Sequence, residues 1–542
     1  MRKSNEILHR IKPGVNDYFS ITARHFINAG FAGLSHFNIL LNAFLIDVNN
    51  STIEELNSVF ALLLYKDHSK DRTSDSSYHT ISTCPLVAKG LDMFVRDLNI
   101  EKWNKIQADT QYQGEGSSHE LASLLITEAV QHSRFVSCQP TFLLFLDARS
   151  AFDTVVIPYL IRKLHMADTD ANTILFMDNR LNNRVTFCEF NKDLAGPIHD
   201  EQGLEQGGIA SSDCYKVYNN ELLSQVQSSK LGVDMGGSLV VSGVGQDDDT
   251  GLLSNDIFKL MHLLQLAMDD CKKFNVTLIS SKTKLLLVQP ARKPTFVPYN
   301  PVMIDGVEVQ FVDQAEHVGV IRSTTGNMPN LLQRISAFKK ALGSVISCGL
   351  ARGRRTNPSA SLRTLTIYGT PVLMSGLASQ VLSAKEVAIL DQQFKRTLQN
   401  ILKLSVNSPS AVVYFVAGSL PATALLHLRQ ISVFAMICRL PGDPLNLHAQ
   451  QVLLTSSSAG HSWFTQVRNL LLMYQLPHPL NLLANPPAKE SFKKLVKAKV
   501  TDYWETKLRL EASFLPSLPY FCPAFLSLTS THRLWTSAGN KS

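Results

Sequence analysis

The sequence is poor in cysteine, with eight cysteines among 542 residues. The eight are scattered along the chain at Cys84, Cys138, Cys188, Cys214, Cys271, Cys348, Cys438 and Cys522. No two of them have the Cys-x-x-Cys spacing of a zinc site, and no dense group suggests a disulfide framework. We therefore expect reduced, mostly buried thiols.

Long apolar runs are also absent. The most apolar stretch, residues 411–427, is interrupted by Ser419, Pro421 and Thr423. It is shorter than the roughly 20 apolar residues that a membrane-spanning helix needs. The N-terminal residues lack the apolar core of a signal peptide. These features predict a soluble, intracellular protein that does not enter a membrane.

Acidic residues are scarce in one segment, from Arg322 to Lys403. It contains twelve Lys or Arg residues but only Glu386 and Asp391 as acids, a net charge of +10, whereas the whole chain carries +7. A basic block next to a carboxylate-bearing block is typical of enzymes that act on nucleic acids. A solvated helical face explains the charge equally well, so charge alone does not decide the function.

The apolar periodicity predicts an α+β protein in which helices and strands alternate in the centre and helices follow. Residues 1–50 have a helical pattern, a β-hairpin with a charged tip begins near Leu62, and the pattern after Arg322 is almost wholly helical. In the centre we expect helices over 85–105, 117–133, 155–166, 170–181 and 256–273, a Gly-rich entry at 203–208 to a long helix through Gln227, and strands over 141–147, 238–244 and 250–254.

Three motifs in this central block carry the chemistry. Asp147 ends the apolar strand TFLLFLD, Asp248 and Asp249 lie in the turn GQDDDT, and the glycine-rich sequence GLEQGGIASS lies between them. Carboxylates from two strands can bind hard cations through oxygen, and a two-metal site supports in-line phosphoryl transfer. Because no His or Cys ligand is near, we expect two Mg²⁺ ions, with Mn²⁺ as a substitute. Each motif alone fits an ordinary turn or helix cap, but their order and spacing favour a catalytic site.

With these motifs, and with SSKTK and EHVGV following in the same order, the chain resembles reverse transcriptases of non-LTR, LINE-like retrotransposons. The resemblance implies RNA-directed DNA synthesis and a right-hand polymerase fold. It implies that Asp147, Asp248 and Asp249 are the catalytic metal ligands and that Phe152 is the aromatic residue that excludes a ribose 2′-hydroxyl. It also implies roles in binding the nucleotide or the template for Gln206, Gly207, Ser211 and Lys282.

The resemblance extends to the segments on both sides of the centre. It implies an N-terminal helical extension over 1–55, fingers over 56–140, a palm over 141–321, a thumb over 322–404 and a C-terminal helical extension over 405–542. In the fingers, Lys66 and His79 would bind the nucleotide. In the thumb, Arg352, Arg354 and Arg355 would bind the template–primer. The implied partners are an RNA template, a DNA primer or RNA–DNA duplex and dNTPs. No sequence feature points to a protein partner, and family resemblance places the action in the nucleus.

Three positions depart from the family pattern. Asp247 stands where a small residue usually precedes the Asp pair, His79 replaces an arginine that binds triphosphate, and Ser212 replaces a proline. An added carboxylate repels its neighbours, and a neutral imidazole lacks the fixed charge of a guanidinium. One alternative is therefore an impaired remnant that only binds RNA or DNA. Another is an RNA-copying RNA polymerase, against which Phe152 argues.

Overall fold

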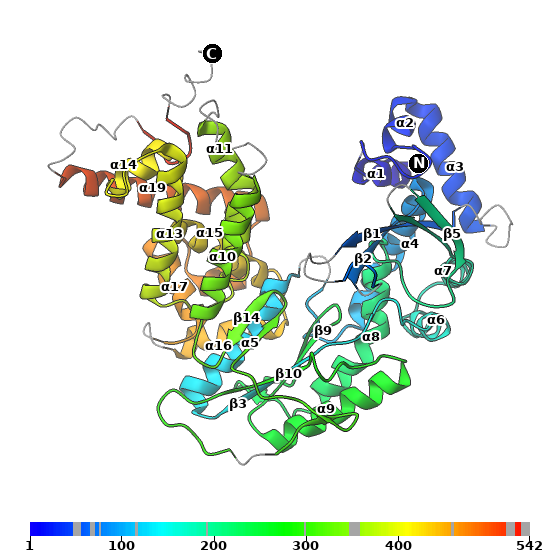
Figure 1. Cartoon of the computed structure of the whole chain (residues 1–542), viewed down its shortest axis with the longest axis horizontal. Coiled ribbons are helices and arrows are strands. Elements are labelled where there is room, and N and C mark those ends of the chain that lie inside the picture. Colours follow the sequence, from blue (N-terminus) through cyan, green and yellow to red (C-terminus); the bar gives the residue numbers. More distant parts are fainter. Residues whose placement is uncertain are drawn as a thin grey trace.

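The computed structural model describes residues 1–12, 14–46, 56–65, 71–74, 77–113, 117–190, 193–297, 300–345, 358–456, 460–515 and 526–532. Figure 1 shows three parts arranged around an open centre. The N-terminal helices and the first β-sheet lie on one side, a second sheet with its helices forms the base, and the helices that follow lie on the other side. This is the fingers, palm and thumb arrangement of a right hand.

The fingers sheet has four strands in the order β2-β1-β4-β5. They are β1 (Ser58–Tyr65), β2 (Tyr78–Thr83), β4 (Val185–Phe190) and β5 (Asp193–His199). The predicted hairpin is present, with Leu62 opposite Ile81 in the antiparallel β1–β2 pair. However, β1 also pairs in parallel with β4, which comes from the segment predicted as palm. The fingers therefore combine two separate stretches of sequence, because a strand can pair along both of its edges.

Helices support this sheet and connect it to the N-terminus. The bounds are α1 (Arg2–Arg10), α2 (Ala23–Asn28), α3 (Gly30–Ile46), α4 (Leu86–Lys105), α6 (Ile157–Met166) and α7 (Ala171–Asn182). Helices α1 and α3 both pack on α4. Their buried side chains form one apolar core with those of α6 and α7, in which Phe37, Trp103 and Leu160 are almost fully buried.

The palm sheet is antiparallel, with the order β10-β3-β9-β8. Its strands are β3 (Thr141–Leu146), β8 (Gly243–Gln246), β9 (Asp249–Ser254) and β10 (Lys284–Val288). All six residues of β3 are buried, as a strand covered on both faces requires. Leu143 and Phe145 belong to the core that the thumb side shares, whereas Phe142, Leu144 and Leu146 belong to the core on the other face.

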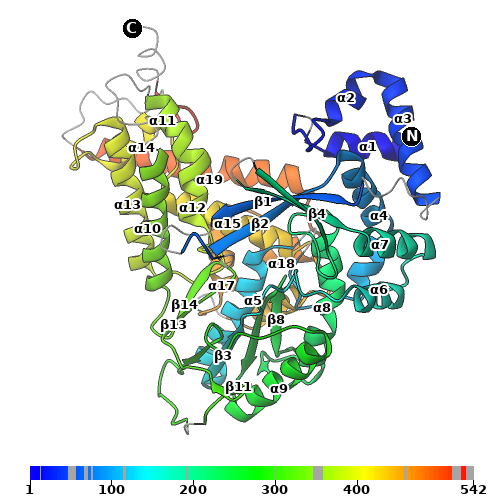
Figure 2. The ribbon, with the colours of Figure 1, turned by 45° about the vertical axis from the view of Figure 1, so that its right-hand side comes forward.

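Two long helices cover that other face, and a third covers the thumb side. They are α8 (Ser211–Ser228), α9 (Ile257–Lys273) and α5 (His119–His132), the last continuing into the π-helical turn η3 (Ser133–Ser137). Both views place α8 between the fingers sheet and the palm sheet (Figures 1 and 2). It therefore connects the fingers sheet to the palm sheet.

The prediction of one strand over 238–244 is wrong. The structure has β7 (Val240–Val241), which pairs with β6 (Val233–Asp234), and then β8, which pairs with β9. Ser242 separates them, and its backbone nitrogen donates to the Gln227 side chain instead of to a strand. The apolar pattern runs through both pieces, so the sequence did not show that their partners differ. Small hairpins follow as β11 (Met303–Ile304) with β12 (Val307–Glu308) and β13 (Gln314–His317) with β14 (Val320–Ser323).

The thumb and the C-terminal helices share a single apolar core, which runs from Leu331 through Phe394 to Val500. The thumb helices are α10 (Met328–Val345), α11 (Pro358–Thr364), the π-helical turn η5 (Leu365–Gly369), α12 (Thr370–Met374) and α13 (Ala384–Leu402). The later helices are α14 (Ser410–Ala417), α15 (Ala422–Ile437), α16 (Pro444–Thr455), α17 (Trp463–Met473), α18 (Pro479–Ala484) and α19 (Lys489–Ser513). The two predicted units therefore form one packed body.

Polar contacts fix this body to the palm. Glu128 of α5 is buried and accepts hydrogen bonds from the Trp463 backbone at 2.8 Å and from the Ser462 hydroxyl, and it contacts His448 Nε2 at 3.2 Å.

Within the described part of the chain, no single helix has the length and apolar character for crossing a membrane; only α14 and α15 together, bent by 64°, pass on length and composition.

Candidate active site

Asp147 directly follows the central palm strand β3, at one end of the sheet. Its backbone nitrogen donates to Thr283 Oγ1 at 3.4 Å, and its carbonyl accepts from the Ile279 backbone at 2.8 Å. These bonds hold the chain where it leaves the strand, and they leave the carboxylate partly exposed. A buried strand that ends in a fixed, accessible carboxylate is the geometry that the sequence predicted for this residue.

The turn between β8 and β9 brings the other carboxylates to the same edge. Gln246 pairs with Asp249, so Asp247 and Asp248 form a two-residue turn, and Asp247 adopts a left-handed φ of +56°. Strand β9 lies beside β3, with Thr250 opposite Leu146. Because Asp147 and Asp249 directly flank this residue pair, the structure brings Asp147, Asp248 and Asp249 together at one end of the sheet.

Burial and mutual repulsion raise the pKa values of two of these carboxylates. Burial, with the added charges of Asp248, Asp147 and Glu316, raises the pKa of Asp249 to about 6. Burial also raises the pKa of Asp248, followed by the charge of Asp147. Lys282 Nζ lies 3.4 Å from Asp147 Oδ1 and supplies a positive charge to the group. The site therefore concentrates negative charge that a bound cation would stabilise.

The donor set fits a divalent metal ion. Only carboxylate oxygens converge here, and hard divalent cations prefer oxygen ligands. Within the described ranges, no three His, Cys, Asp or Glu side chains are already close enough to form a ready-made metal site. The three aspartates would therefore have to draw together around a cation, whose positive charge would offset the repulsion among them.

Asp247, the extra carboxylate, is directed elsewhere. Burial and the charge of Asp248, opposed by Lys216 of α8, raise its pKa to about 6. One of its carboxylate oxygens is buried and has no hydrogen-bond partner among the described residues. Lys216 itself is buried and pairs with Asp213 at 2.8 Å. Asp247 therefore belongs to the electrostatic environment of α8 as well as to that of the aspartate cluster.

The Gln206–Gly207 loop joins the palm to the fingers. The Ser82 backbone nitrogen of β2 donates to the Gln206 carbonyl at 2.9 Å, and Gln206 Nε2 donates to Asp153 Oδ1 at 3.1 Å. Gly207 has a φ of +109°, and a Cβ there would lie 3.2 Å from the Ser82 carbonyl. Both the conformation and the close approach favour glycine at this position. Ser211 follows as the first residue of α8.

A buried ion triad that the sequence did not reveal lies beneath this loop. Arg180 of α7 contacts Asp92 of α4 at 3.0 Å and Glu205, the residue before Gln206, at 3.1 Å. Its third nitrogen group donates to the Leu56 carbonyl at 2.9 Å. Burial raises the pKa of Asp92, and Arg180 opposes that shift. The triad fixes the loop to two helices. The charge pattern of the sequence did not reveal it, because Glu205 and Asp92 lie 25 and 88 residues from Arg180 in the chain.

We expect Arg180→Met to lower the free energy of unfolding by about 3–5 kcal/mol, because removing one partner leaves two carboxylates buried without a cation. Urea denaturation of the purified variant measures this. Adding Asp92→Asn and Glu205→Gln to Arg180→Met should restore a large part of the loss. A loss below about 1 kcal/mol in the single variant would show that water already reaches the triad.

Phe152 follows Asp147 in the chain and contacts both α8 and the glycine-rich loop. Its ring stacks on Tyr215 of α8, with the ring centroids 4.6 Å apart and the planes at 20°. Its carbonyl accepts from the Leu204 backbone at 2.8 Å, which ties it to the glycine-rich loop. The ring is partly buried, so one part of it packs against the core while the rest remains accessible. This placement is compatible with the predicted role in excluding a 2′-hydroxyl.

The EHVGV sequence forms a tight hairpin between β13 and β14, in which Val318 and Gly319 have φ values of +48° and +69°. His317 of this hairpin is only 4% exposed and stacks on Phe145 of β3, with the centroids 4.5 Å apart. Neither of its ring nitrogens has a hydrogen-bond partner among the described residues. Burial and the charge of Arg322 lower its pKa from 6.5 to about 3. The hairpin is therefore attached to the catalytic strand through a neutral histidine.

This buried histidine predicts acid sensitivity. Between pH 6.5 and pH 3 the unfolded chain binds a proton that folded His317 excludes, so stability present above pH 6.5 is lost as the pH falls. Lowering the pH from 7 to 5 should cost about 2 kcal/mol through this group. We expect His317→Phe, which keeps the stacking, to show a pH-dependent loss in urea denaturation that is smaller by that amount. An equal pH dependence in the two proteins would contradict the assignment.

Several predicted site residues are not placed. Lys66, Arg352, Arg354 and Arg355 lie outside the described residues. His79 lies in β2 opposite Leu64, and only its backbone is described. Ser212 lies in the first turn of α8, so serine at this position permits the helix to begin. The roles of these residues stay predictions.

A family model for reverse transcriptase (RNA-dependent DNA polymerase) matches residues 68–319. The retrovirus-related Pol polyprotein from type-1 retrotransposable element R2 of Popillia japonica is 21% identical over 304 residues, which are 54% of this chain and 48% of that protein. Residues 68–319 therefore match the reverse transcriptase family, and the expected resemblance to non-LTR elements is confirmed.

The relatives also show the extent of the similarity. The chain spans about half the length of the curated retrotransposon protein that it matches. Among solved structures, apo telomerase from Candida tropicalis matches 80% of this chain and 74% of its own chain, at 8% identity and a TM-score of 0.40. A form truncated from the C-terminal domain matches 50% and 54%, at 10% identity and a TM-score of 0.34. TM-scores of this size do not assign a fold.

Proposed function

We propose that the chain is an RNA-directed DNA polymerase of a non-LTR retrotransposon-like element, which extends a primer 3′-hydroxyl on an RNA template. The observation that carries this proposal is the convergence of Asp147, Asp248 and Asp249 at one end of the palm sheet, within the segment that matches the reverse transcriptase family. We infer that the reaction takes place in the nucleus, where target DNA lies.

The three aspartates would hold two Mg²⁺ ions, for which Mn²⁺ could substitute. When bound, these ions neutralise the triphosphate and stabilise the attacking and leaving oxygens of an in-line phosphoryl transfer. The carboxylates contribute by position, because β3 and the β8–β9 turn fix them from two strands of one sheet. A rigid sheet is suited to this task, since small displacements of reacting groups lower the rate strongly.

Other residues position the nucleotide. Lys282 is exposed beside Asp147, so its ammonium group can turn toward a triphosphate. Gln206 and Gly207 form the surface on which the nucleotide rests, because their loop is held against β2 by the Ser82 contact. Phe152 fills the space that a 2′-hydroxyl needs, supported from behind by Tyr215. Lys66 and His79 are the further residues that we propose for nucleotide binding.

The thumb and the start of α8 bind the template–primer. Ser211 contacts the template, and Arg352, Arg354 and Arg355 contact the phosphates of the duplex. The support for the thumb contacts is the charge of the segment from Arg322 to Lys403, which contains twelve basic residues and two acidic ones. Phosphate contacts of this kind depend on salt and not on sequence.

Primer extension tests the proposal and separates the enzyme from a remnant that only binds nucleic acid. The purified chain is given an RNA template with an annealed DNA primer, dNTPs and Mg²⁺, and duplex binding is measured in parallel by fluorescence anisotropy. We expect extension on the RNA template. Duplex binding without any extension, in Mg²⁺ and in Mn²⁺, would contradict the proposal and favour the remnant.

A further inference from the structure

A cavity of about 570 Å³ lies in the thumb, between α10, α11 and α13, away from the aspartate cluster. This volume lies in the range of small-molecule and cofactor sites. The cavity is lined by Lys339, Leu342, Gly343, Val345, Ser361, Thr364, Leu365, Gln393, Arg396, Thr397, Asn400, Ile401 and Lys403. Nothing in the proposed catalytic reaction uses it.

The charge of this cavity has one sign. Lys339, Arg396 and Lys403 line it, and the described lining contains no carboxylate. None of the three cations forms an ion pair with another described residue. Unpaired cations around a hollow attract an anion, and phosphate is the anion that suits a lysine and an arginine together.

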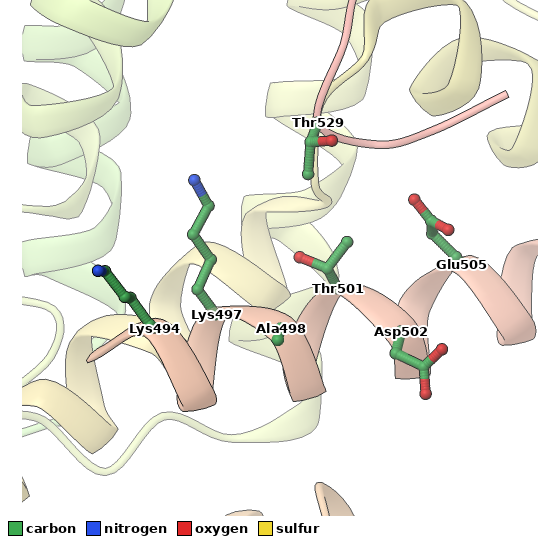
Figure 3. A pocket seen from close by; sticks show the side chains of 7 residues that line it. All are labelled: Lys494, Lys497, Ala498, Thr501, Asp502, Glu505 and Thr529. Atoms are coloured by element: carbon green, nitrogen blue, oxygen red, sulfur yellow. The ribbon is translucent and has the colours of Figure 1, made fainter. Parts of the chain in front are cut away.

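A second hollow on α19 provides a contrast. It measures about 370 Å³ and is lined by Lys494 and Lys497 but also by Asp502 and Glu505 (Figure 3). Figure 3 shows these four charged side chains along one helix, with the lysines at one end and the acids at the other. Two cations with two anions give no net preference for phosphate. The thumb cavity differs because its cations have no such counterparts.

The remaining wall of the thumb cavity indicates more than a bare phosphate. Leu342, Val345, Leu365 and Ile401 supply apolar surface, whereas Thr364, Gln393, Thr397 and Asn400 supply hydroxyl and amide groups. A cavity of this size holds a larger molecule than phosphate. A base would pack on the apolar side, polar side chains would meet its edge or the sugar, and the cations would contact the phosphate.

The position of the cavity excludes the catalytic nucleotide as its ligand. Helix α10 begins at Met328, just after the palm hairpin, and rises away from the palm (Figure 1). At a rise of roughly 1.5 Å per residue, Leu342 lies about 21 Å along the helix. A ligand bound here therefore lies away from the palm, which carries the aspartate cluster.

We propose that this thumb cavity binds one unpaired nucleotide of a single-stranded nucleic acid, with its phosphate on Lys339, Arg396 and Lys403 and its base against the apolar wall. A base in a duplex is stacked and paired and does not enter such a cavity, whereas an unpaired base can. Resting on the proposed function, the strand is a segment of the RNA that does not pair with the primer. The cavity thus selects single strands, in contrast to the general attraction of the thumb for any phosphate.

A binding measurement with the full chain tests this without any catalysis, so an inactive polymerase would not obscure the result. Fluorescence anisotropy compares a 12-nucleotide oligouridylate with a blunt RNA–DNA duplex. The test variant is Arg396→Gln with Lys403→Gln, and the matched control is Lys494→Gln with Lys497→Gln, which removes equal charge. We expect the test variant to lose about tenfold or more in affinity for the single strand, and the control to lose less than about threefold. Equal losses in the two variants would overturn the proposal.

Two further experiments distinguish the contribution of the base to binding from the contribution of the charge. Ile401→Trp fills the cavity without changing any charge, and we expect it to weaken oligouridylate binding while leaving duplex binding unchanged. An abasic oligonucleotide of the same length lacks the bases. We expect its affinity for the parent protein to be no higher than the affinity of oligouridylate for Ile401→Trp. Unweakened oligouridylate binding in Ile401→Trp, with its melting temperature unchanged, would also overturn the proposal. Oligodeoxyuridylate then distinguishes RNA from DNA as the strand that the cavity prefers.

Discussion

Asp147→Asn is expected to reduce primer extension by about 10³-fold or more, equivalent to roughly 4 kcal/mol of transition-state stabilisation. The substitution keeps the size of the side chain and its backbone bonds to Thr283 and Ile279. It removes the charge that faces Asp248 and Asp249. Binding of the RNA–DNA duplex should change little, because the thumb is untouched. Single-turnover extension at saturating dNTP, with duplex binding by anisotropy, measures both.

The matched control is Asp269→Asn, because Asp269 is an exposed aspartate of α9 whose side chain bonds only Gln265 among the described partners. It loses the same charge far from the β3 edge and should retain extension within about twofold. If Asp147→Asn extends primers within tenfold of the parent, the aspartate cluster is not the catalytic site.

Phe152→Val should relax the choice of sugar by about 10²-fold or more, measured as the ratio of kcat/KM for dNTP to that for rNTP. The aromatic ring is held against Tyr215 at 4.6 Å, so it cannot swing aside to admit a 2′-hydroxyl. Valine removes most of the ring and opens that space. The gain should appear mainly as a lower KM for rNTP, because the removed interaction is a clash on binding.

Phe258→Val serves as the control for this effect. Phe258 is 62% exposed on α9, so its truncation removes a ring of equal size without opening the site. Its sugar preference should equal that of the parent. An unchanged preference in Phe152→Val would mean that Phe152 only packs against Tyr215 and that another group excludes ribonucleotides.

The sequence was most informative where a local pattern coincides with a local structure. The apolar run before Asp147 is a strand buried on both faces, the acidic triplet is a hairpin turn, and the glycine-rich segment leads into α8. In each case the local structure depends on residues that are neighbours in the sequence, through the periodicity of their side chains or through a required glycine. The convergence of Asp147 with Asp248 then follows from antiparallel pairing of β3 with β9.

Long-range contacts were less accessible from the sequence. Nothing local indicates that β4 pairs with β1, because either edge of a strand can accept a partner. The Arg180 triad and the Glu128 contacts to Ser462 and Trp463 join residues far apart in the chain. The sequence indicated His317 only as one position of a strand with alternating burial. Its stacking on Phe145 of β3 could not be predicted from the sequence. Such features arise from packing between elements and require the fold.

The claim that the three aspartates form one cation site is tested most directly by counting bound metal. Electron paramagnetic resonance follows Mn²⁺ binding to the chain with a template–primer that ends in a dideoxynucleotide and a non-hydrolysable dNTP. We expect two Mn²⁺ ions per chain in the parent, and at least one fewer in Asp147→Asn and in Asp248→Asn, with no change in Asp269→Asn. Equal Mn²⁺ binding by the parent and all three variants would contradict the account.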